Sequence, residues 1–283
     1  MKINRRIRAD QIDLQNREEV CKSLLKDPIF FPLVFSRFSF RPDQEIIVIR
    51  DDVLCGGTKS RVAYSLIQSF VNQGWKEFVY ISPWYGGGQI ALAWIIRHLS
   101  KDVQFKATII LSMKNEIGDL LSGLPPFTKI AQRLGATILF CPPDRSLESF
   151  AQNYVQSKSN AILLRSGFDY PEVKKNLAYL AHKVVDYFGH FDECWCAAGS
   201  GTLIRGLQSN QHQPALAKRY FAVCVFQECP PIDKAKGVIP FLPFPEPVED
   251  NEKPPFPSAL RYDAKVWKYI RNRPGKILFW NVM

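Results

Sequence analysis

One lysine stands in a segment whose residue types suit covalent chemistry, the sequence CGGTKSR at 55–61. The mainly apolar stretch 45–53 predicts a buried strand that leaves into a charged turn, and apolar residues at helical spacing over 61–70 predict a helix. Lys59 is therefore expected in a glycine-rich loop that opens a helix. The positive end of that helix and the neighbouring Arg61 would lower the pKa of its amine, and a neutral amine is what a lysine needs to form an imine.

Simpler interpretations of this segment exist. An isolated Gly-Gly-Thr-Lys is most often a solvated turn with an ordinary lysine. A nucleotide phosphate loop needs the spacing Gly-x-x-x-x-Gly-Lys-Ser/Thr, and here only Gly56 and Gly57 precede Lys59. The spacing therefore argues against a phosphate loop, and the rest of the chain must separate the turn from the imine-forming lysine.

A second glycine-rich segment, AAGSGT at 197–202, follows an apolar stretch and precedes a helical pattern over 203–207. Backbone N–H groups at such a helix start point toward an anion, and Ser200 and Thr202 add hydroxyl donors. The segment is equally consistent with a strand-to-helix connection that uses glycine for its geometry alone.

A third segment, LRYDAKV at 260–266, lies near the carboxyl end and contains Tyr262 and Asp263. Taken alone, Asp263 predicts a cap in front of a surface helix over 264–270.

Strand-like and helix-like patterns alternate over most of the chain, which predicts an α/β protein with mostly parallel sheets. Further strands are expected at 77–82, 106–111, 136–140, 160–164, 191–198 and 276–283. Further helices are expected at 90–99, 127–134, 147–156, 172–188 and 202–209. The proline-rich region 229–257 is expected to be an ordered loop packed on the body.

The chain has 283 residues, of which 46% are hydrophobic and 23% charged, as in soluble globular proteins. It contains no apolar run of membrane-spanning length and no secretory signal pattern, so a cytoplasmic location is expected. The seven cysteines lack the spacing of a zinc site, which predicts free thiols and no metal. The net charge of +10 favours a polyanionic partner or substrate, of which nucleic acid is one kind.

Together the three segments resemble those of fold-type II pyridoxal-phosphate (PLP) enzymes, nearest the branch of aminocyclopropane-carboxylate deaminase and D-cysteine desulfhydrase. In that branch an Arg-Asp/Glu-Asp run precedes Gly-Gly-Asn-Lys-x-Arg, which residues 50–52 and 56–61 match except that Thr58 replaces the asparagine. The resemblance implies two three-layer α/β/α domains with the cofactor in the cleft between them, and a homodimer. Residues 1–61 plus 166–283 would form the large PLP-binding domain, and 62–165 the small inserted domain.

The resemblance also assigns roles to residues. It implies that Lys59 carries the cofactor and acts as acid and base, and that Tyr262 lies near the cofactor ring. Asp263 would face the pyridine nitrogen, because a carboxylate there keeps that nitrogen protonated. The loop expected to bind the cofactor phosphate lacks one glycine of the commonest form and consists of Gly199, Ser200, Gly201 and Thr202.

The substrate loop departs from the family pattern. Relatives have a Ser/Thr-x-Asn or Ser-Asn-His loop where this chain has SPWYGGGQ at 82–89, so the asparagine and the catalytic serine are absent. Tyr85 is a candidate catalytic residue in their place, and Arg165 is a candidate for binding an anionic substrate. The loop still precedes a helix start, so four residues are expected to bind the substrate carboxylate: Gly86, Gly87, Gly88 and Gln89.

These patterns favour a PLP-dependent, lyase- or deaminase-like enzyme acting at the α-carbon of an amino acid or an amino-acid-bearing molecule. One alternative is a PLP enzyme, such as a decarboxylase or lyase, that modifies an amino-acid-bearing nucleotide or DNA base, which the positive charge favours. Another is a non-catalytic binding or scaffold protein that kept the fold, which the altered substrate loop favours. The motifs do not choose the bond that is cleaved.

Overall fold

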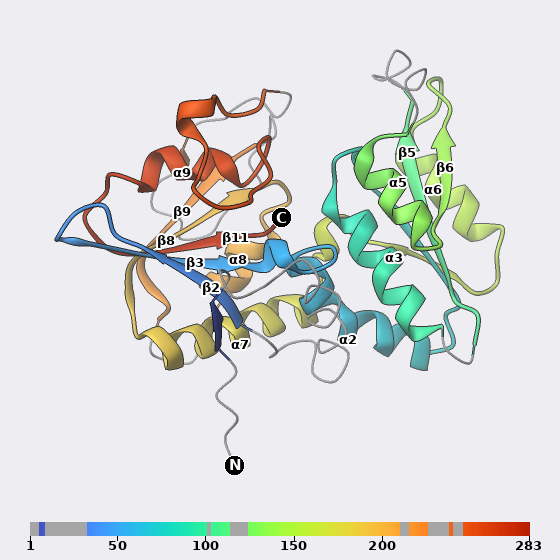
Figure 1. The fold of residues 1–283 in the computed structure, drawn as a ribbon. Helices are drawn as coiled ribbons and strands as arrows, with labels where there is room; N and C mark the ends of the chain where they lie inside the picture. The colour runs from blue at the N-terminus through green and yellow to red at the C-terminus, as the bar shows by residue number, and fades with distance from the viewer. Residues whose placement is uncertain are drawn as a thin grey trace. The chain divides into compact units, whose positions relative to one another are not determined.

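The computed structural model describes residues 6–8, 33–100, 103–113, 124–209, 215–225, 238–239 and 246–283. The chain forms two compact units: a larger one, Met1–Thr58 with Asp169–Met283, and a smaller one, Lys59–Phe168 (Figure 1). Both are α/β structures with mostly parallel sheets, which confirms the fold class expected from the alternation of patterns.

The larger unit is built on a seven-stranded sheet in the order β1-β2-β3-β11-β8-β9-β10. Neighbouring strands from β3 to β10 are parallel, whereas β2 runs antiparallel to β3. The central pair β3 and β11 comes from distant parts of the sequence, with Arg50 opposite Asn281. The strands are β1 (Arg6–Arg8), β2 (Leu33–Phe38), β3 (Gln44–Arg50), β8 (Phe191–Ala198), β9 (Ala217–Cys224), β10 (Val238–Ile239) and β11 (Gly275–Asn281).

Helices cover this sheet on both sides. Figure 1 shows α9 above β8 and β11 and α7 below them. The core on the α9 side joins Val266 and Trp267 of the helix to Trp195 of β8 and Phe279 of β11, all of them buried. The helices of the unit are η3 (Asp51–Val53), α7 (Pro171–Phe188), α8 (Thr202–Gln208), η5 (Asp250–Glu252) and α9 (Ala264–Ile270).

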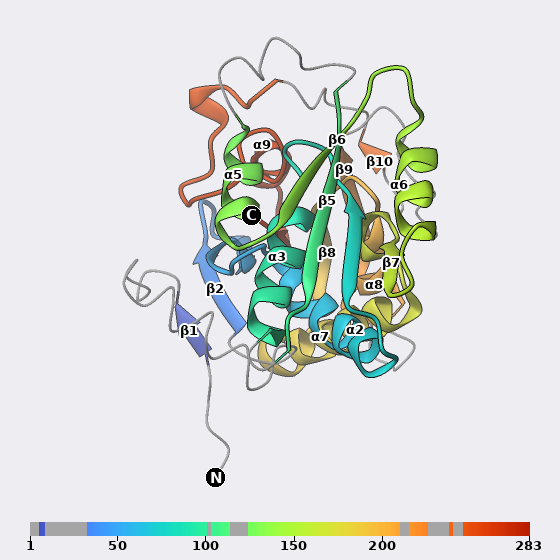
Figure 2. The same ribbon diagram turned by 90° about the vertical axis from the view of Figure 1, so that its right-hand side faces the viewer.

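The smaller unit has a four-stranded parallel sheet in the order β6-β5-β4-β7. Its strands are β4 (Glu77–Ile81), β5 (Lys106–Ser112), β6 (Thr137–Cys141) and β7 (Ala161–Leu164). Its helices are α2 (Thr58–Asn72), α3 (Gly87–Leu99), α5 (Pro126–Arg133), α6 (Leu147–Gln156) and η4 (Ser166–Phe168). Ala151 of α6 packs on Val79 and Ile110 of the sheet, and in Figure 2 α3 and α6 lie to either side of β5.

The structure differs from the expected elements in a few places. The strand expected over 45–53 ends at Arg50, because 51–53 turn into a short 3₁₀ helix. The helix expected over 61–70 begins earlier, at Thr58. Of the loop expected over 229–257, residues 229–237 and 240–245 lie outside the described residues. The prediction of free thiols is wrong at one described position, because Cys224 is disulfide-bonded, whereas Cys55, Cys141, Cys194 and Cys196 are free.

Glu77, the first residue of β4, holds a buried polar network in the smaller unit. Its carboxylate accepts hydrogen bonds from Thr108 Oγ1 (2.6 Å) and the Tyr154 hydroxyl (2.7 Å), and Lys106 Nζ lies 3.2 Å away. Burial raises the pKa of Glu77, but the hydrogen bonds from Thr108, Tyr154 and Lys106 outweigh it and bring the pKa below its ordinary value. The ionised carboxylate therefore stabilises the folded unit.

This network predicts a specific pH dependence of stability. Because the folded pKa of Glu77 is lowered, its contribution is complete above the unfolded value of about 4.3 and is lost as the pH falls through the folded value. Glu77→Gln is expected to lower the free energy of unfolding by about 1–3 kcal/mol at neutral pH and to flatten the decline of stability on acidification. Urea unfolding at a series of pH values measures both effects, with exposed Glu148→Gln as control. Equal pH profiles for wild type and Glu77→Gln would contradict the assignment.

Candidate functional site

The carboxyl edge of the larger sheet gathers several of the predicted residues. The strands β3, β11 and β8 are adjacent and parallel, so the segments that follow them emerge at one edge. The segment after β3 leads to Thr58, the segment after β11 is Val282–Met283, and the segment after β8 is the loop 199–202.

A buried ion pair fixes the start of the segment after β3. Arg50 donates to both oxygens of Asp52, from Nε at 2.7 Å and Nη2 at 2.8 Å, and both side chains are buried. Asn281 of β11 donates to Asp52 Oδ1 (2.8 Å), and Ser258 donates to Asn281 Oδ1 (2.7 Å). A bidentate pair with satisfied oxygens is the geometry in which burying two charges is tolerated. The turn after β3 is thereby fastened to the end of β11.

A second carboxylate, that of Asp51, fastens the end of the same segment. Asp51 Oδ2 accepts hydrogen bonds from Thr58 Oγ1 (2.8 Å) and from Trp280 Nε1 (2.9 Å), and it is fully buried. Gly57, the residue before Thr58, has φ +66°. It packs so closely on the carbonyl of Val282 that a Cβ atom would overlap the carbonyl oxygen. The hydroxyl of Thr58 thus donates to Asp51 and accepts a hydrogen bond from Trp280 Nε1 at 3.1 Å. Lys59 is the next residue in the chain, the first of the smaller unit, and is half-buried.

The loop after β8 is held in the conformation that its glycines allow. Gly201 has φ +73°, a left-handed conformation, and stands directly before α8. Ser200 Oγ lies 3.1 Å from Thr202 Oγ1, and the Thr202 N–H donates to Ser200 Oγ at 3.5 Å. The loop therefore presents two hydroxyl groups and glycine backbone together, a donor set suited to a phosphate.

Asp263 is fully buried at the start of α9. Its Oδ2 accepts a hydrogen bond from the Met283 N–H at 3.0 Å, which places the carboxylate at the end of β11. Burial, Cys194 and the negative charge of Asp263 together raise the pKa of Cys196 on β8 well above its ordinary value. A buried carboxylate of this kind favours a cation beside it. Tyr262 is half-buried and packs against the core on the α9 side.

The glycine-rich loop 86–89, which was expected to bind a substrate carboxylate, belongs to the smaller unit and is held by hydrogen bonds of its own side chains. Gln89 is fully buried, and its Nε2 donates to the Trp84 carbonyl (3.0 Å) and more weakly to the Pro83 carbonyl (3.4 Å). The Trp84 indole donates to the Ser112 carbonyl at 2.9 Å. Gly88 leaves room for Tyr80, whose ring a Cβ atom would meet at 2.7 Å. The amide of Gln89 thus shapes the loop, while Tyr85 between Trp84 and Gly86 is exposed.

The predicted site residues fall into two sets. The larger unit carries Tyr262, Asp263 and the loop 199–202. The smaller unit carries Lys59, Tyr85, the loop 86–89 and the exposed Arg165. The function proposed for the chain requires both sets in one site.

Sequence reasoning missed the residues that hold the site in place. Trp280 and Asn281 were expected only as the end of a strand, yet both donate to the aspartates after β3. The available signal was a polar residue at the end of an otherwise buried apolar strand, which calls for a hydrogen-bond partner. Within the described parts of the chain there is neither a group of His, Cys, Asp and Glu that could hold a metal ion nor a helix long and apolar enough to cross a membrane.

No family model and no curated protein matches the chain. Solved structures do match it. An O-acetylserine dependent cystathionine beta-synthase from Helicobacter pylori gives a TM-score of 0.66 at 15% identity, covering 96% of this chain and 95% of that one. A hydrogen sulfide-producing enzyme from Fusobacterium nucleatum gives 0.65 at 12% identity, covering 88% and 92%. An ACC deaminase homologue gives 0.62 at 14% identity, covering 84% of each chain.

These matches define the fold. The chain has the fold of the fold-type II PLP enzymes, which confirms the resemblance that the three sequence segments suggested. At these identities the likeness concerns the fold alone.

The anchoring of Thr58 predicts the effect of removing one hydroxyl. Thr58→Val keeps the shape of the side chain but deprives Asp51 of a hydrogen bond in a buried place. The free energy of unfolding is expected to fall by about 1–3 kcal/mol, and amide hydrogen exchange in the first turn of α2 is expected to become faster. Thr137→Val in β6 is the matched control and is expected to change stability by no more than about 0.5 kcal/mol. Equal losses in the two variants would contradict the anchoring role.

Proposed function

We propose that the chain is a PLP-dependent enzyme that acts at the α-carbon of an amino acid or an amino-acid-bearing molecule, in the manner of a lyase or deaminase. The observation that carries the proposal is the convergence, on one edge of the larger sheet, of a buried carboxylate, a glycine-hydroxyl loop and the anchored residue before Lys59. The fold, shared with enzymes that make or break bonds in amino acids, supports it.

The residues present suit the cofactor. A phosphate group needs hydrogen-bond donors, and the loop of Gly199, Ser200, Gly201 and Thr202 offers hydroxyl groups and backbone N–H groups. A pyridine nitrogen that must stay protonated needs a buried negative partner, and Asp263 is buried with one oxygen held by the Met283 N–H. Bound PLP would supply an electron sink for a carbanion at the substrate α-carbon.

The chain's own groups then have defined tasks. Lys59 would hold the cofactor through its amine and would move a proton at the substrate α-carbon. Asp263 would keep the ring nitrogen protonated, and the half-buried Tyr262 would lie near the ring. The backbone of Gly86, Gly87, Gly88 and Gln89 binds the substrate carboxylate, with Gln89 also fixing the loop from behind. The exposed Tyr85 would take the catalytic role of the absent serine, and the exposed Arg165 would bind an anionic group of the substrate. A homodimer is the proposed assembly.

The positive charge favours a second candidate within the same chemistry. A PLP decarboxylase or lyase acting on an amino-acid-modified nucleotide or DNA base would have a polyanionic substrate, which the net charge of +10 would attract. A non-catalytic scaffold is disfavoured, because it needs neither a lysine at position 59 nor a buried carboxylate at position 263.

The decisive experiment uses the covalent attachment itself. Purified protein mixed with PLP is expected to be yellow, and borohydride reduction followed by peptide mass mapping is expected to find the reduced cofactor on Lys59. Lys59→Ala should lose both the absorption band and the reducible adduct, whereas Lys76→Ala, which removes an exposed lysine of the same unit, should keep both. A reducible adduct retained in Lys59→Ala would overturn the proposal.

A further inference from the structure

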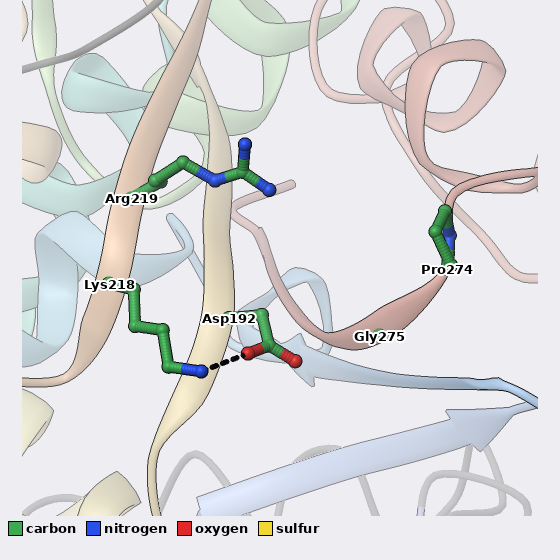
Figure 3. A pocket seen from close by; sticks show the side chains of 5 residues that line it. All are labelled: Asp192, Lys218, Arg219, Pro274 and Gly275. Atoms are coloured by element: carbon green, nitrogen blue, oxygen red, sulfur yellow. Dashed lines mark hydrogen bonds and ion pairs between the residues drawn. The ribbon is translucent and has the colours of Figure 1, made fainter.

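A cavity of about 460 Å³ opens at the amino edge of the larger sheet, where β8, β9 and β11 begin. It lies at the edge opposite to the candidate site, because these strands are parallel and the site is at their carboxyl ends. Figure 3 shows the residues that line it: Asp192, Lys218, Arg219, Pro274 and Gly275.

The floor of this cavity is built around Asp192. Its Oδ1 accepts a hydrogen bond from Lys218 Nζ (2.7 Å) and its Oδ2 accepts one from the Lys276 N–H (2.9 Å). Gly275 has φ +90°, and a Cβ atom there would approach Asp192 Oδ2 to 2.9 Å. The glycine thus allows the strand to come close to the carboxylate. The hydrogen bond from Lys218 lowers the pKa of Asp192. The charges of the Lys218 ammonium and the Asp192 carboxylate therefore cancel each other.

Next to it, one buried carboxylate orients two arginines. Glu193 is buried and accepts hydrogen bonds from Arg219 Nη2 (2.6 Å) and Arg273 Nη2 (3.0 Å), while Arg273 Nε lies 2.8 Å from its other oxygen. The Arg273 guanidinium also lies over the Trp195 ring, 5.1 Å from its centroid. The group of two arginines and one glutamate carries one net positive charge. A guanidinium has five N–H donors, and both arginine side chains are partly exposed, so donors remain for a ligand.

Further basic residues lie beside these arginines, at the starts of the neighbouring strands. The segment RNRPGK at 271–276, which leads into β11, has three basic residues and no acidic one. Arg41, in the turn before β3, donates to the Asn272 carbonyl at 3.1 Å and so adjoins this segment, and it also donates to both oxygens of Asp43, at 3.1 and 3.2 Å. Because β3, β11, β8 and β9 are neighbours, the row from Arg41 past Arg273 to Arg219 spans about 14 Å at the usual spacing of strands. We call Arg41, Arg271, Arg273, Lys218 and Arg219 the basic edge; together with the carboxylates that pair with them, those of Asp43, Asp192 and Glu193, it has a net charge of +2.

We propose that the basic edge binds the phosphodiester backbone of a nucleic acid. Arginine presents a fork of donors that matches phosphate oxygens, and arginines held by Glu193 lose little freedom on binding. A row of cations suits a chain of successive phosphates, whereas a single small anion would engage only the cavity. Release of counterions from the nucleic acid drives such binding, so it weakens steeply with salt. The inference does not depend on the cofactor proposal.

The test removes charge from the exposed end of the row. Binding of a short fluorescein-labelled DNA duplex by the full chain is measured by fluorescence anisotropy from about 20 to about 200 mM salt. Lys218→Gln/Arg219→Gln is expected to bind about tenfold more weakly, with a plot of log K against log salt that is less steep by about 1.8. The matched control Lys129→Gln/Arg133→Gln removes the same charge from two exposed residues of α5 and is expected to bind like wild type.

Two kinds of result would overturn the proposal, and a further variant separates it from the cofactor proposal. Equal losses in the two double variants, or no duplex binding by wild type at about 20 mM salt, would overturn the proposal. Displacement of the duplex by millimolar inorganic phosphate, at constant ionic strength, would instead identify a small-anion pocket and overturn it too. Lys59→Ala is expected to bind the duplex normally, so that failure of the cofactor proposal and failure of this one are told apart. Circular dichroism spectra and melting temperatures equal to wild type establish that the variants are folded.

Discussion

The carboxylate of Asp51 is the contact on which the candidate site in the larger unit depends. It is a buried acceptor shared by Thr58, from the segment that leads to the lysine, and Trp280, from the strand that forms the centre of the sheet. Beside it, Arg50 and Asp52 neutralise each other, and Asn281 ties them to the same strand. Because buried polar groups are costly when unpaired, these contacts together stabilise the observed conformation of the backbone just before Lys59.

Much of this arrangement was predictable from sequence, and the reasons differ by element. Alternation of apolar patterns predicted helix 147–156 and strand 191–198 with their observed bounds, because both are local patterns with clear ends. The fold type followed from short segments around Lys59, Thr202 and Asp263. The role of Trp280 did not, because it depends on β11 pairing with β3, and a residue's partner across a sheet leaves no local pattern. Strands β2 and β9 were also not predicted. The structural role of Gln89 was not predicted for a related reason: the sequence does not show whether an amide side chain is buried or faces a substrate.

The two edges of the larger sheet differ in where they place charged side chains. At the carboxyl edge, buried aspartates are each matched to neutral donors or to a single arginine, so charge is confined inside the structure. At the amino edge, one glutamate holds two arginines that reach the surface, so positive charge is presented outward. Strand β8 serves both edges, since Glu193 lies near its start and the loop 199–202 follows its end. The same strand therefore supports two surfaces with separate chemistry.

The pairing of β3 with β11 also constrains the order in which the molecule can assemble on the ribosome. Residues 59–168 are contiguous and contain every strand of their own sheet, so this part can acquire its hydrogen bonds early in synthesis. Strand β3, although made before residues 59–168, must wait for the synthesis of β11 before its inner edge is covered. Until then Asp51 and Asp52 lack the donors of Trp280 and Asn281, and the nascent chain carries an open strand edge beside an unformed lysine loop.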